Sequence, residues 1–156
     1  MVLTSDSVSQ TQTIAKRLAK SLKSGDVLAL IGNLGSGKTV FVKGLAEGLG
    51  CRKKDVISPT FVLLRQYKGK VDINHFDLYR LKNMRQLIDI GYEEYFYSDG
   101  VAVIEWADRI ESALPEEHIR IEFTIKGDNK RLIKIIYKRR KLDCRGAIYG
   151  ARKRAG

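Results

Sequence analysis

LALIGNLGSGKTVFVKGLAEGLG, residues 28–50, passes from an unbroken apolar run into a glycine-rich loop and then into a helix-forming segment. The apolar run, residues 27–31, is typical of a strand that is covered on both faces of its sheet. Residues 32–39 fit the pattern G-x-x-x-x-G-K-[ST], in which glycines let backbone N–H groups approach a phosphate closely. A helix follows and stops at Gly50. A strand, this loop and a helix in that order predict a nucleotide-binding site.

The remaining pattern predicts strands that alternate with helices. An amphipathic helix is expected over residues 9–23, and residues 83–96 are predicted to be helical at first and irregular after Gly91. Strands are predicted over residues 60–69, 70–77 and 100–110, and a hairpin over 118–138 around the turn sequence GDN. The expected fold class is therefore α/β: a P-loop NTPase with three α/β/α layers, a mixed, mostly parallel central sheet and a C-terminal antiparallel hairpin.

Charge is distributed unevenly along the 156 residues. The net charge is +11, and residues 126–156 hold 12 Lys/Arg against 2 Asp/Glu, a net of +10. We therefore expect one P-loop domain over residues 1–138 and a basic C-terminal tail over 139–156. The tail can neutralise RNA phosphates, or it can be a solvated terminus that aids solubility. Charges interrupt every apolar run, and the two cysteines lack metal-ligand spacing, so we expect a cytoplasmic protein with no membrane partner.

Two acidic residues come at the ends of predicted strands. Asp77 ends a half-apolar strand and Glu105 ends a fully apolar one. Because the carboxyl ends of strands line the ligand crevice of open α/β sheets, both could face Lys38 and Thr39. In that arrangement Lys38 would bind the β- and γ-phosphates, and Thr39 would bind Mg²⁺. The alternatives are a turn residue or cap for Asp77 and a surface salt bridge for Glu105. His75 is interpreted as a packed or hydrogen-bonded residue.

The glycine loop alone does not separate an ATPase from a kinase or a GTPase. No N-K-x-D segment typical of guanine recognition is present in the sequence. A small-molecule kinase usually carries a mobile lid with arginines. The segment that could serve as a lid, residues 107–117, is short and more acidic than such a lid, which favours hydrolysis. A third alternative, an RNA-binding module built around the tail, leaves the loop and the two acids unexplained.

Four motifs together resemble the TsaE (YjeE) family of bacterial ATPases in tRNA threonylcarbamoyladenosine biosynthesis. These motifs, in family order and spacing, are GNLGSGKT at residues 32–39, SPTF at 58–61, HFDLYR at 75–80 and IEW at 104–106. The resemblance runs from about residue 5 to residue 137 and excludes the tail. The family usually has G-D-L-G-A-G-K-T, where this chain has Asn33 and Ser36.

The resemblance implies a role for each matching residue. Asp77, Glu105 and Thr60 would be catalytic, with Thr60 in a switch loop that senses the γ-phosphate. Thr39, Glu105 and Asp77 would hold Mg²⁺. The residues that would bind ATP are Asn33, Leu34, Gly35, Ser36, Gly37, Lys38, Thr39, Trp106 and Arg131. Of these, Arg131 would approach the adenine base.

The resemblance also implies a biological setting. A member of this family would act as a small ATPase with the TsaD–TsaB transferase complex, in forming the threonylcarbamoyl group on the adenosine beside the anticodon of tRNA. Contact with tRNA would be indirect or through the basic tail. The alternative function is a small-molecule P-loop kinase, which phosphate release without an acceptor would contradict.

Overall fold

A computed structural model describes residues 1–57 and 62–139. The predicted switch residue Thr60 and the basic tail beyond Arg139 lie outside the described residues. The elements are, in chain order, β1 (Val2–Ser5), α1 (Val8–Ala19), β2 (Val27–Gly32), α2 (Lys38–Gly48), the 3₁₀ helix η1 (Lys53–Asp55), β3 (Leu64–Tyr67), β4 (Ile73–Asp77), α3 (Met84–Asp89), α4 (Tyr92–Phe96), β5 (Val101–Glu105), the 3₁₀ helix η2 (Ala107–Ala113), β6 (His118–Ile125) and β7 (Arg131–Lys138).

The strands form one mixed sheet in the order β1-β7-β6-β2-β5-β4-β3. Its centre is parallel, because β2 pairs with both β6 and β5, and β5 pairs with β4 in the same direction. Its two margins are antiparallel, where β7 pairs with β6 and β1, and β3 pairs with β4. The predicted mixed sheet and C-terminal hairpin are confirmed, and only β3 and β7 run against the common direction.

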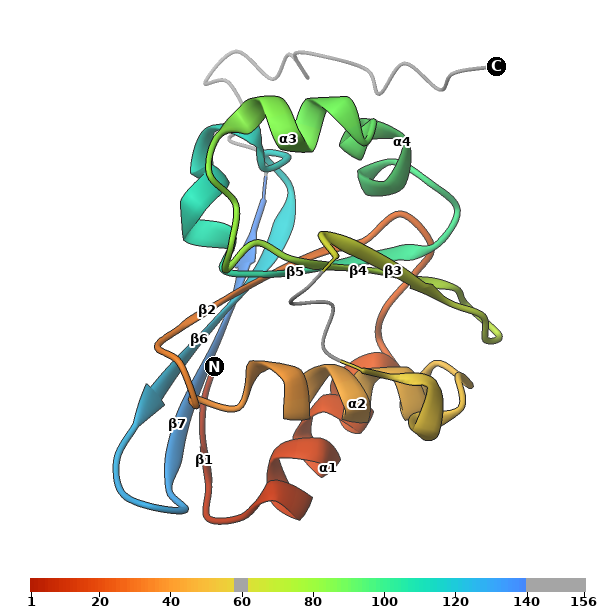
Figure 1. The fold of residues 1–156 in the computed structure, drawn as a ribbon. Helices are drawn as coiled ribbons and strands as arrows, with labels where there is room; N and C mark the ends of the chain where they lie inside the picture. Colours follow the sequence, from red (N-terminus) through yellow and green to blue (C-terminus); the bar gives the residue numbers. More distant parts are fainter. Residues whose placement is uncertain (58–61, 140–156) are drawn as a thin grey trace, which may run out of the picture.

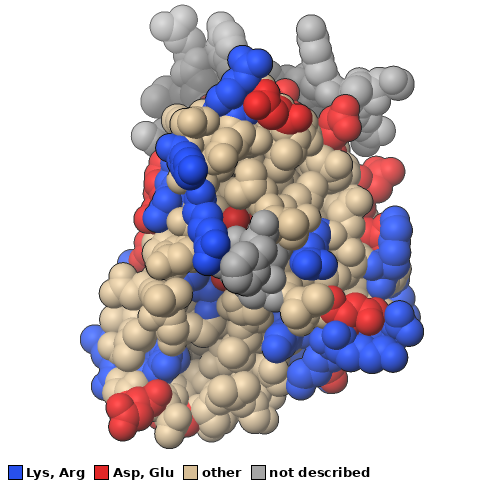
Figure 2. Space-filling model, viewed as in Figure 1, with Lys and Arg blue, Asp and Glu red and all other residues tan. Residues whose placement is uncertain are grey.

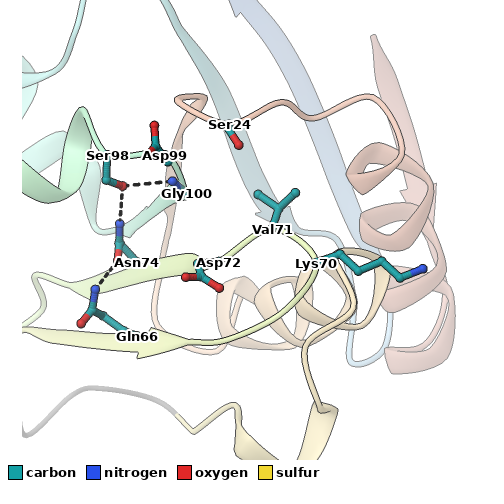
Figure 3. A pocket seen from close by; sticks show the side chains of 9 residues that line it. All are labelled: Ser24, Gln66, Lys70, Val71, Asp72, Asn74, Ser98, Asp99 and Gly100. Atoms are coloured by element: carbon teal, nitrogen blue, oxygen red, sulfur yellow. Dashed lines mark hydrogen bonds between the residues drawn. The ribbon is translucent and has the colours of Figure 1, made fainter. Parts of the chain in front are cut away.

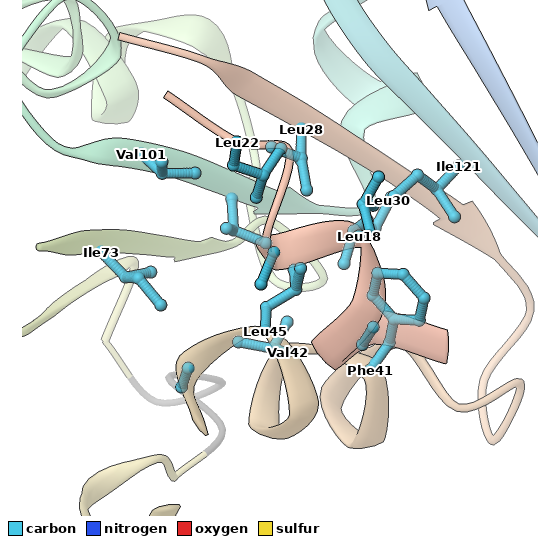
Figure 4. Close-up of a cluster of buried hydrophobic side chains, with 14 of the residues drawn as sticks. Leu18, Leu22, Leu28, Leu30, Phe41, Val42, Leu45, Ile73, Val101 and Ile121 are labelled. Atoms are coloured by element: carbon cyan, nitrogen blue, oxygen red, sulfur yellow. The ribbon is translucent and has the colours of Figure 1, made fainter. Parts of the chain in front are cut away.

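Helices cover both faces of the sheet, which gives three layers (Figure 1). On one face, α1 and α2 lie side by side and enclose a core to which Leu28 and Leu30 of β2 contribute (Figure 4). On the other face, α3, α4 and η2 cover a second core that includes Phe76 and Ile104. Alternate residues of each central strand therefore enter different cores, as the unbroken apolar run of β2 predicts.

The helix pair α1–α2 positions the loop that begins α2. Ser7 caps α1 by accepting a hydrogen bond from the backbone N–H of Gln10. The two helices approach closely at Gly44, where a Cβ would lie 2.4 Å from the carbonyl oxygen of Gln12. Any side chain at Gly44 would push α2 away from α1 and displace the loop at its N-terminus.

Three local features differ from what the sequence predicts. The first residues form an edge strand, β1, which the pattern did not indicate, since a four-residue strand is too short to show alternation. Residues after Gly91 are not irregular: α4 begins at Tyr92, with Gly91 in the left-handed conformation as its N-cap. α1 also ends at Ala19, short of the expected residue 23.

In the described part of the chain, no helix has the length and apolarity needed to cross a membrane.

Candidate nucleotide site

The glycine loop, defined as Gly32–Thr39, connects the end of β2 to the start of α2. Gly35 and Gly37 have φ values of 75° and 99°, in the left-handed region that favours glycine. The space beside both is open, because a Cβ at either position would have no heavy atom within 4 Å. No side chain caps α2, and its first turn holds no acidic residue. The loop backbone and the helix N-terminus can therefore accept an anionic ligand.

Lys38 places a positive charge on this loop. Its ammonium donates hydrogen bonds to the carbonyl oxygens of Gly32, at 2.6 Å, and Asn33, at 3.0 Å. It also lies 4.0 Å from the centre of the Trp106 ring, a cation–π contact. Burial lowers the pKa of Lys38, and the nearby carboxylates, chiefly Glu105, oppose that shift.

The carboxyl ends of β4 and β5 bring the two predicted acids to the same place. Asp77 and Glu105 are register partners on these neighbouring parallel strands, and both are buried. The Thr39 hydroxyl lies 3.0 Å and 3.1 Å from the two carboxylate oxygens of Glu105, to which it donates. Asp77 accepts a hydrogen bond from the backbone N–H of Tyr79 at 3.0 Å. Glu105 is therefore not a surface salt bridge. Asp77 does form a turn through its bond to Tyr79, as the alternative interpretation of that residue expected, but it is buried and lies near Lys38.

Trp106 follows Glu105 in a strained conformation. Its φ of 61° is the one positive value among the non-glycine residues of the described part of the chain. Its ring stacks obliquely on Tyr79, with centroids 5.1 Å apart, and the Arg109 guanidinium carbon lies 5.8 Å from its centre. Such strain persists where the surroundings over-determine a conformation, which is frequent at binding sites. Here it holds the indole against Lys38.

The donor set fits a magnesium ion bound together with a nucleotide. Mg²⁺ prefers oxygen ligands and usually takes one or two carboxylates, waters and substrate phosphates. Thr39, Glu105 and Asp77 offer a hydroxyl and two carboxylates beside the glycine loop. Across residues 1–57 and 62–139, no group of three or more His, Cys, Asp or Glu side chains is arranged to hold a metal by itself.

Most of the predicted site residues lie together. Arg131, at the start of β7, reaches the loop and donates a hydrogen bond to the Gly35 carbonyl oxygen at 3.1 Å. Leu34 is exposed at the tip of the loop, whereas Ser36 is buried. The residues gathered around the loop are Asn33, Leu34, Gly35, Ser36, Gly37, Lys38, Thr39, Asp77, Glu105, Trp106 and Arg131.

Sequence reasoning missed the direct contact between His75 and the site. His75 Nε2 lies 2.8 Å from Glu105 Oε1, and the imidazole is fully buried. The signal available in the sequence was strand alternation, which places His75 on the same face as Asp77. Tyr67, which contacts the other ring nitrogen, could be found only from the pairing of β3 with β4.

A separate pocket of about 340 Å³ lies at the amino-terminal ends of the central strands, whereas the glycine loop lies at their carboxyl ends. It is lined by residues that precede β2, β4 and β5, among them Ser24, Asp72 and Gly100 (Figure 3). Its polar side chains bond to one another: Asn74 donates to Ser98 Oγ at 2.8 Å and accepts from Gln66. The pocket is thus remote from the glycine loop, and the side chains of Gln66, Asn74 and Ser98 within it bond to one another.

Basic side chains also gather outside the glycine loop. Figure 2 shows Lys and Arg at the lower right, over the β3–β4 turn and the segment after α2, with acidic side chains among them. Arg52 pairs with Asp55 at 2.8 Å, and Lys68 pairs with Asp72 at 2.7 Å. These pairs are exposed, so the surface carries a mixed charge and not a uniform basic field.

Comparison with known proteins agrees with this arrangement. Residues 5–133 match the family described as "Threonylcarbamoyl adenosine biosynthesis protein TsaE". The chain belongs to the TsaE family. It is 45% identical to the tRNA threonylcarbamoyladenosine biosynthesis protein TsaE of Bacillus subtilis over 125 residues, 80% of this chain and 77% of that protein. It is 44% identical to the TsaE of Treponema pallidum, over 79% of this chain and 88% of that protein.

A solved structure has the same fold. The crystal structure of Bacillus subtilis YdiB aligns with a TM-score of 0.72 at 35% identity, covering 88% of this chain and 85% of that one. The predicted fold class is therefore confirmed. The family match ends at residue 133, so it leaves the basic tail out of the shared region, as the sequence motifs do.

Proposed function

We propose that this chain is a Mg²⁺-dependent ATPase that serves tRNA threonylcarbamoyladenosine biosynthesis. The observation that carries the proposal is the contact between the Thr39 hydroxyl and the buried Glu105 carboxylate, beside Lys38 at the start of α2. Hydrolysis of a phosphoanhydride needs positive charge at the phosphates and carboxylates that hold the metal and position water. Membership in the TsaE family supplies the pathway, because its relatives carry that name.

The roles of the residues follow from their positions. The glycine loop binds the phosphates through its N–H groups, and Lys38 adds the cation. Thr39, Glu105 and Asp77 would hold Mg²⁺, which when bound neutralises charge that develops on the phosphates. Glu105 and Asp77 are buried on adjacent strands, so their carboxylates are pre-oriented and need little reorganisation. Trp106 contacts Lys38, and Arg131 donates a hydrogen bond to the Gly35 carbonyl oxygen, so both lie beside the loop.

We further propose that TsaD–TsaB is the partner and that it stimulates hydrolysis. Contact with tRNA would then be indirect, or through the basic tail, whose charge would make binding depend on salt. Formation of threonylcarbamoyladenosine on tRNA by TsaD–TsaB, measured with and without this chain, tests the pathway. Phosphate release in the absence of any acceptor, increased by TsaD–TsaB, tests the activity; transfer of phosphate to a small molecule instead would contradict it.

Nucleotide binding is testable with the single tryptophan. Because Trp106 contacts Lys38, we expect ATP with Mg²⁺ to change its fluorescence. Lys38→Ala should abolish that titration, since the phosphates lose their main cation. Lys43→Ala, a lysine of the same helix but away from the loop, is the matched control and should titrate as the wild type does. Unchanged ATP affinity in Lys38→Ala would contradict the proposed site.

A further inference from the structure

A line of hydrogen bonds runs from the candidate metal site into the sheet. Glu105, which accepts from Thr39, also contacts His75 Nε2 at 2.8 Å through Oε1. The other ring nitrogen of His75, Nδ1, lies 3.1 Å from the Tyr67 hydroxyl. That hydroxyl donates to the carbonyl oxygen of Ile57 at 2.7 Å. The imidazole thus bridges a predicted metal ligand and a buried tyrosine.

The register of three strands explains why these side chains meet. Tyr67 on β3 pairs with Ile73 on β4, so His75, two residues further on, is its diagonal neighbour on the same face. His75 in turn pairs with Val103 on β5, and Glu105 lies two residues beyond it. Diagonal neighbours lie about 7–8 Å apart at Cα, which aromatic and long side chains can span.

The line lies in the core beneath α2, where polar groups are expensive to bury. The side chain of His75 is 0% exposed, that of Glu105 3% and that of Tyr67 5%. Surrounding positions on this face are apolar, including Val101 and Val103. A buried polar group without a partner costs about 1–3 kcal/mol, so an unbonded histidine here would lower the stability of the fold. Bonding at both ring nitrogens fixes the ring orientation instead.

The chemistry of the acceptor at Glu105 places a proton on Nε2 of His75. An ionised carboxylate can only accept, so Nε2 of His75 donates to Glu105. Burial raises the pKa of Tyr67 to about 12, so its hydroxyl keeps its single hydrogen, which it donates to the Ile57 carbonyl oxygen while its oxygen lies 3.1 Å from Nδ1.

We propose that His75 and Tyr67 are positioning residues that hold the Glu105 carboxylate in the orientation that faces Thr39. His75 fixes Oε1, and the contact of Tyr67 with Nδ1 fixes the tilt of the His75 ring. Groups behind a metal ligand typically change metal affinity or activity by about 10–100-fold when they are removed. The inference rests on the proposed function only in assigning Glu105 to Mg²⁺ and hydrolysis; the hydrogen-bonded line itself is a property of the protein without nucleotide.

Two substitutions of His75 form a matched pair. His75→Gln can place an amide N–H where Nε2 lies and keep the bond to Glu105. His75→Asn places its amide where Nδ1 lies, facing Tyr67, and cannot reach Glu105. We expect His75→Asn to lower kcat for ATP hydrolysis by about 10–100-fold while ATP affinity, measured through Trp106, is retained, and His75→Gln to recover most of the rate.

Tyr67→Phe is the milder variant and keeps the ring in the core. We expect it to lower kcat less than His75→Asn does, because His75 retains its bond to Glu105. Wild-type hydrolysis in His75→Asn would overturn the proposal. Equal loss in His75→Asn and His75→Gln would overturn it too, because the imidazole would then act by shape alone.

Nitrogen-15 NMR of the two histidines tests the line without nucleotide. The chain has only His75 and His118, so His118→Gln assigns both. We expect His75 to show a slowly exchanging proton on Nε2, and to lose that slow proton in Glu105→Ala. A ring without a proton on Nε2, or one unaffected by Glu105→Ala, would overturn the proposal even in an active ATPase. The predicted spectrum in a protein that neither binds nor hydrolyses ATP would support the line and reject the proposed function.

Discussion

The two faces of the central sheet are made by the same strands but bury different chemistry at their carboxyl ends. On the face covered by α1 and α2, β4 and β5 end in His75, Asp77 and Glu105. On the face covered by α3 and α4, the corresponding positions are Phe76 and Ile104, packed in an apolar core. Since both faces are covered by helices and hold buried apolar cores, burial alone does not explain the polar residues. Their concentration at one end of one face indicates a function there and a mainly structural role for the other face.

Removing apolar volume from the α3–α4 face is expected to have the largest effect. The Phe76 ring packs edge-on against Phe96, with centroids 5.2 Å apart. Phe76→Ala should lower the free energy of unfolding by about 3–5 kcal/mol, because it loses buried area and leaves a cavity. Urea denaturation measures this loss, and ATP hydrolysis per folded molecule should be unchanged.

The equivalent change on the other face sharpens the comparison. Phe41 of α2 packs edge-on against Phe123, with centroids 5.3 Å apart, two residues after Thr39. Phe41→Ala should destabilise the protein to a similar extent and also weaken ATP binding, since α2 carries Lys38 and Thr39. If both variants affected ATP binding equally, the two faces would not be functionally distinct.

Glu105→Gln is expected to have the next largest effect, and on activity alone. It should lower ATP hydrolysis by about 100-fold, because the site loses a carboxylate, while the amide keeps the side chain's size. The free energy of unfolding should stay the same or rise, since a neutral amide is cheaper to bury than a carboxylate. Phosphate release and urea denaturation measure the two quantities.

Glu111→Gln provides the matched control for that change. Glu111 is an exposed acid paired with Arg120, away from the glycine loop, so its substitution should leave hydrolysis unaffected. A Glu105→Gln protein that hydrolyses ATP at the wild-type rate would break the assignment of function to this face.

Asn74 is the polar exception on the structural face, and it is expected to matter for stability only. Its amide donates to the Tyr95 carbonyl oxygen at 3.1 Å and to Ser98 Oγ at 2.8 Å, which ties the end of α4 to β4. Asn74→Ala should cost about 1–3 kcal/mol by leaving these acceptors unpaired. Hydrogen exchange should become faster in residues 92–96, and ATP affinity should not change. A loss of ATP affinity would extend the functional region across the sheet.

The fold and most of the site followed from the sequence because their signals are local. The residues of the glycine loop indicate its conformation, since Gly35 and Gly37 have positive φ values that favour glycine. The apolar run of β2 places this loop at the end of a strand. Parallel neighbours then bring Asp77 and Glu105 together, because both end their strands at the same edge. Thr60 and the basic tail stay predictions, as they lie outside the described residues.

Features that depend on non-local pairing could not be read from the sequence. β1 exists because it pairs with β7 across most of the chain, and four residues alone give no period. The contact of His75 with Tyr67 depends on the register of β3 against β4, which a one-residue shift would abolish. α4 forms directly after Gly91 because its apolar residue Phe96 packs against Phe76. This tertiary contact outweighs the low helix propensity of the glycine.

The smallest expected effect concerns pH and the charge that Lys38 contributes to the functional face. Burial lowers the pKa of Lys38 below the ordinary lysine value of 10.5, so the free protein loses this proton earlier than a surface lysine does. Bound phosphate favours the ammonium and raises the pKa again, so ATP binding takes up a proton in the window between the two values. ATP affinity should therefore be constant below the pKa that Lys38 has in the free protein and fall by about tenfold per pH unit above it.

Fluorescence titration of Trp106 from about pH 7 to pH 10 measures this dependence of ATP affinity on pH. Lys38→Arg, which stays charged throughout this range, should remove it. The same alkaline loss in Lys38→Arg would show that another group on this face, and not Lys38, controls the affinity.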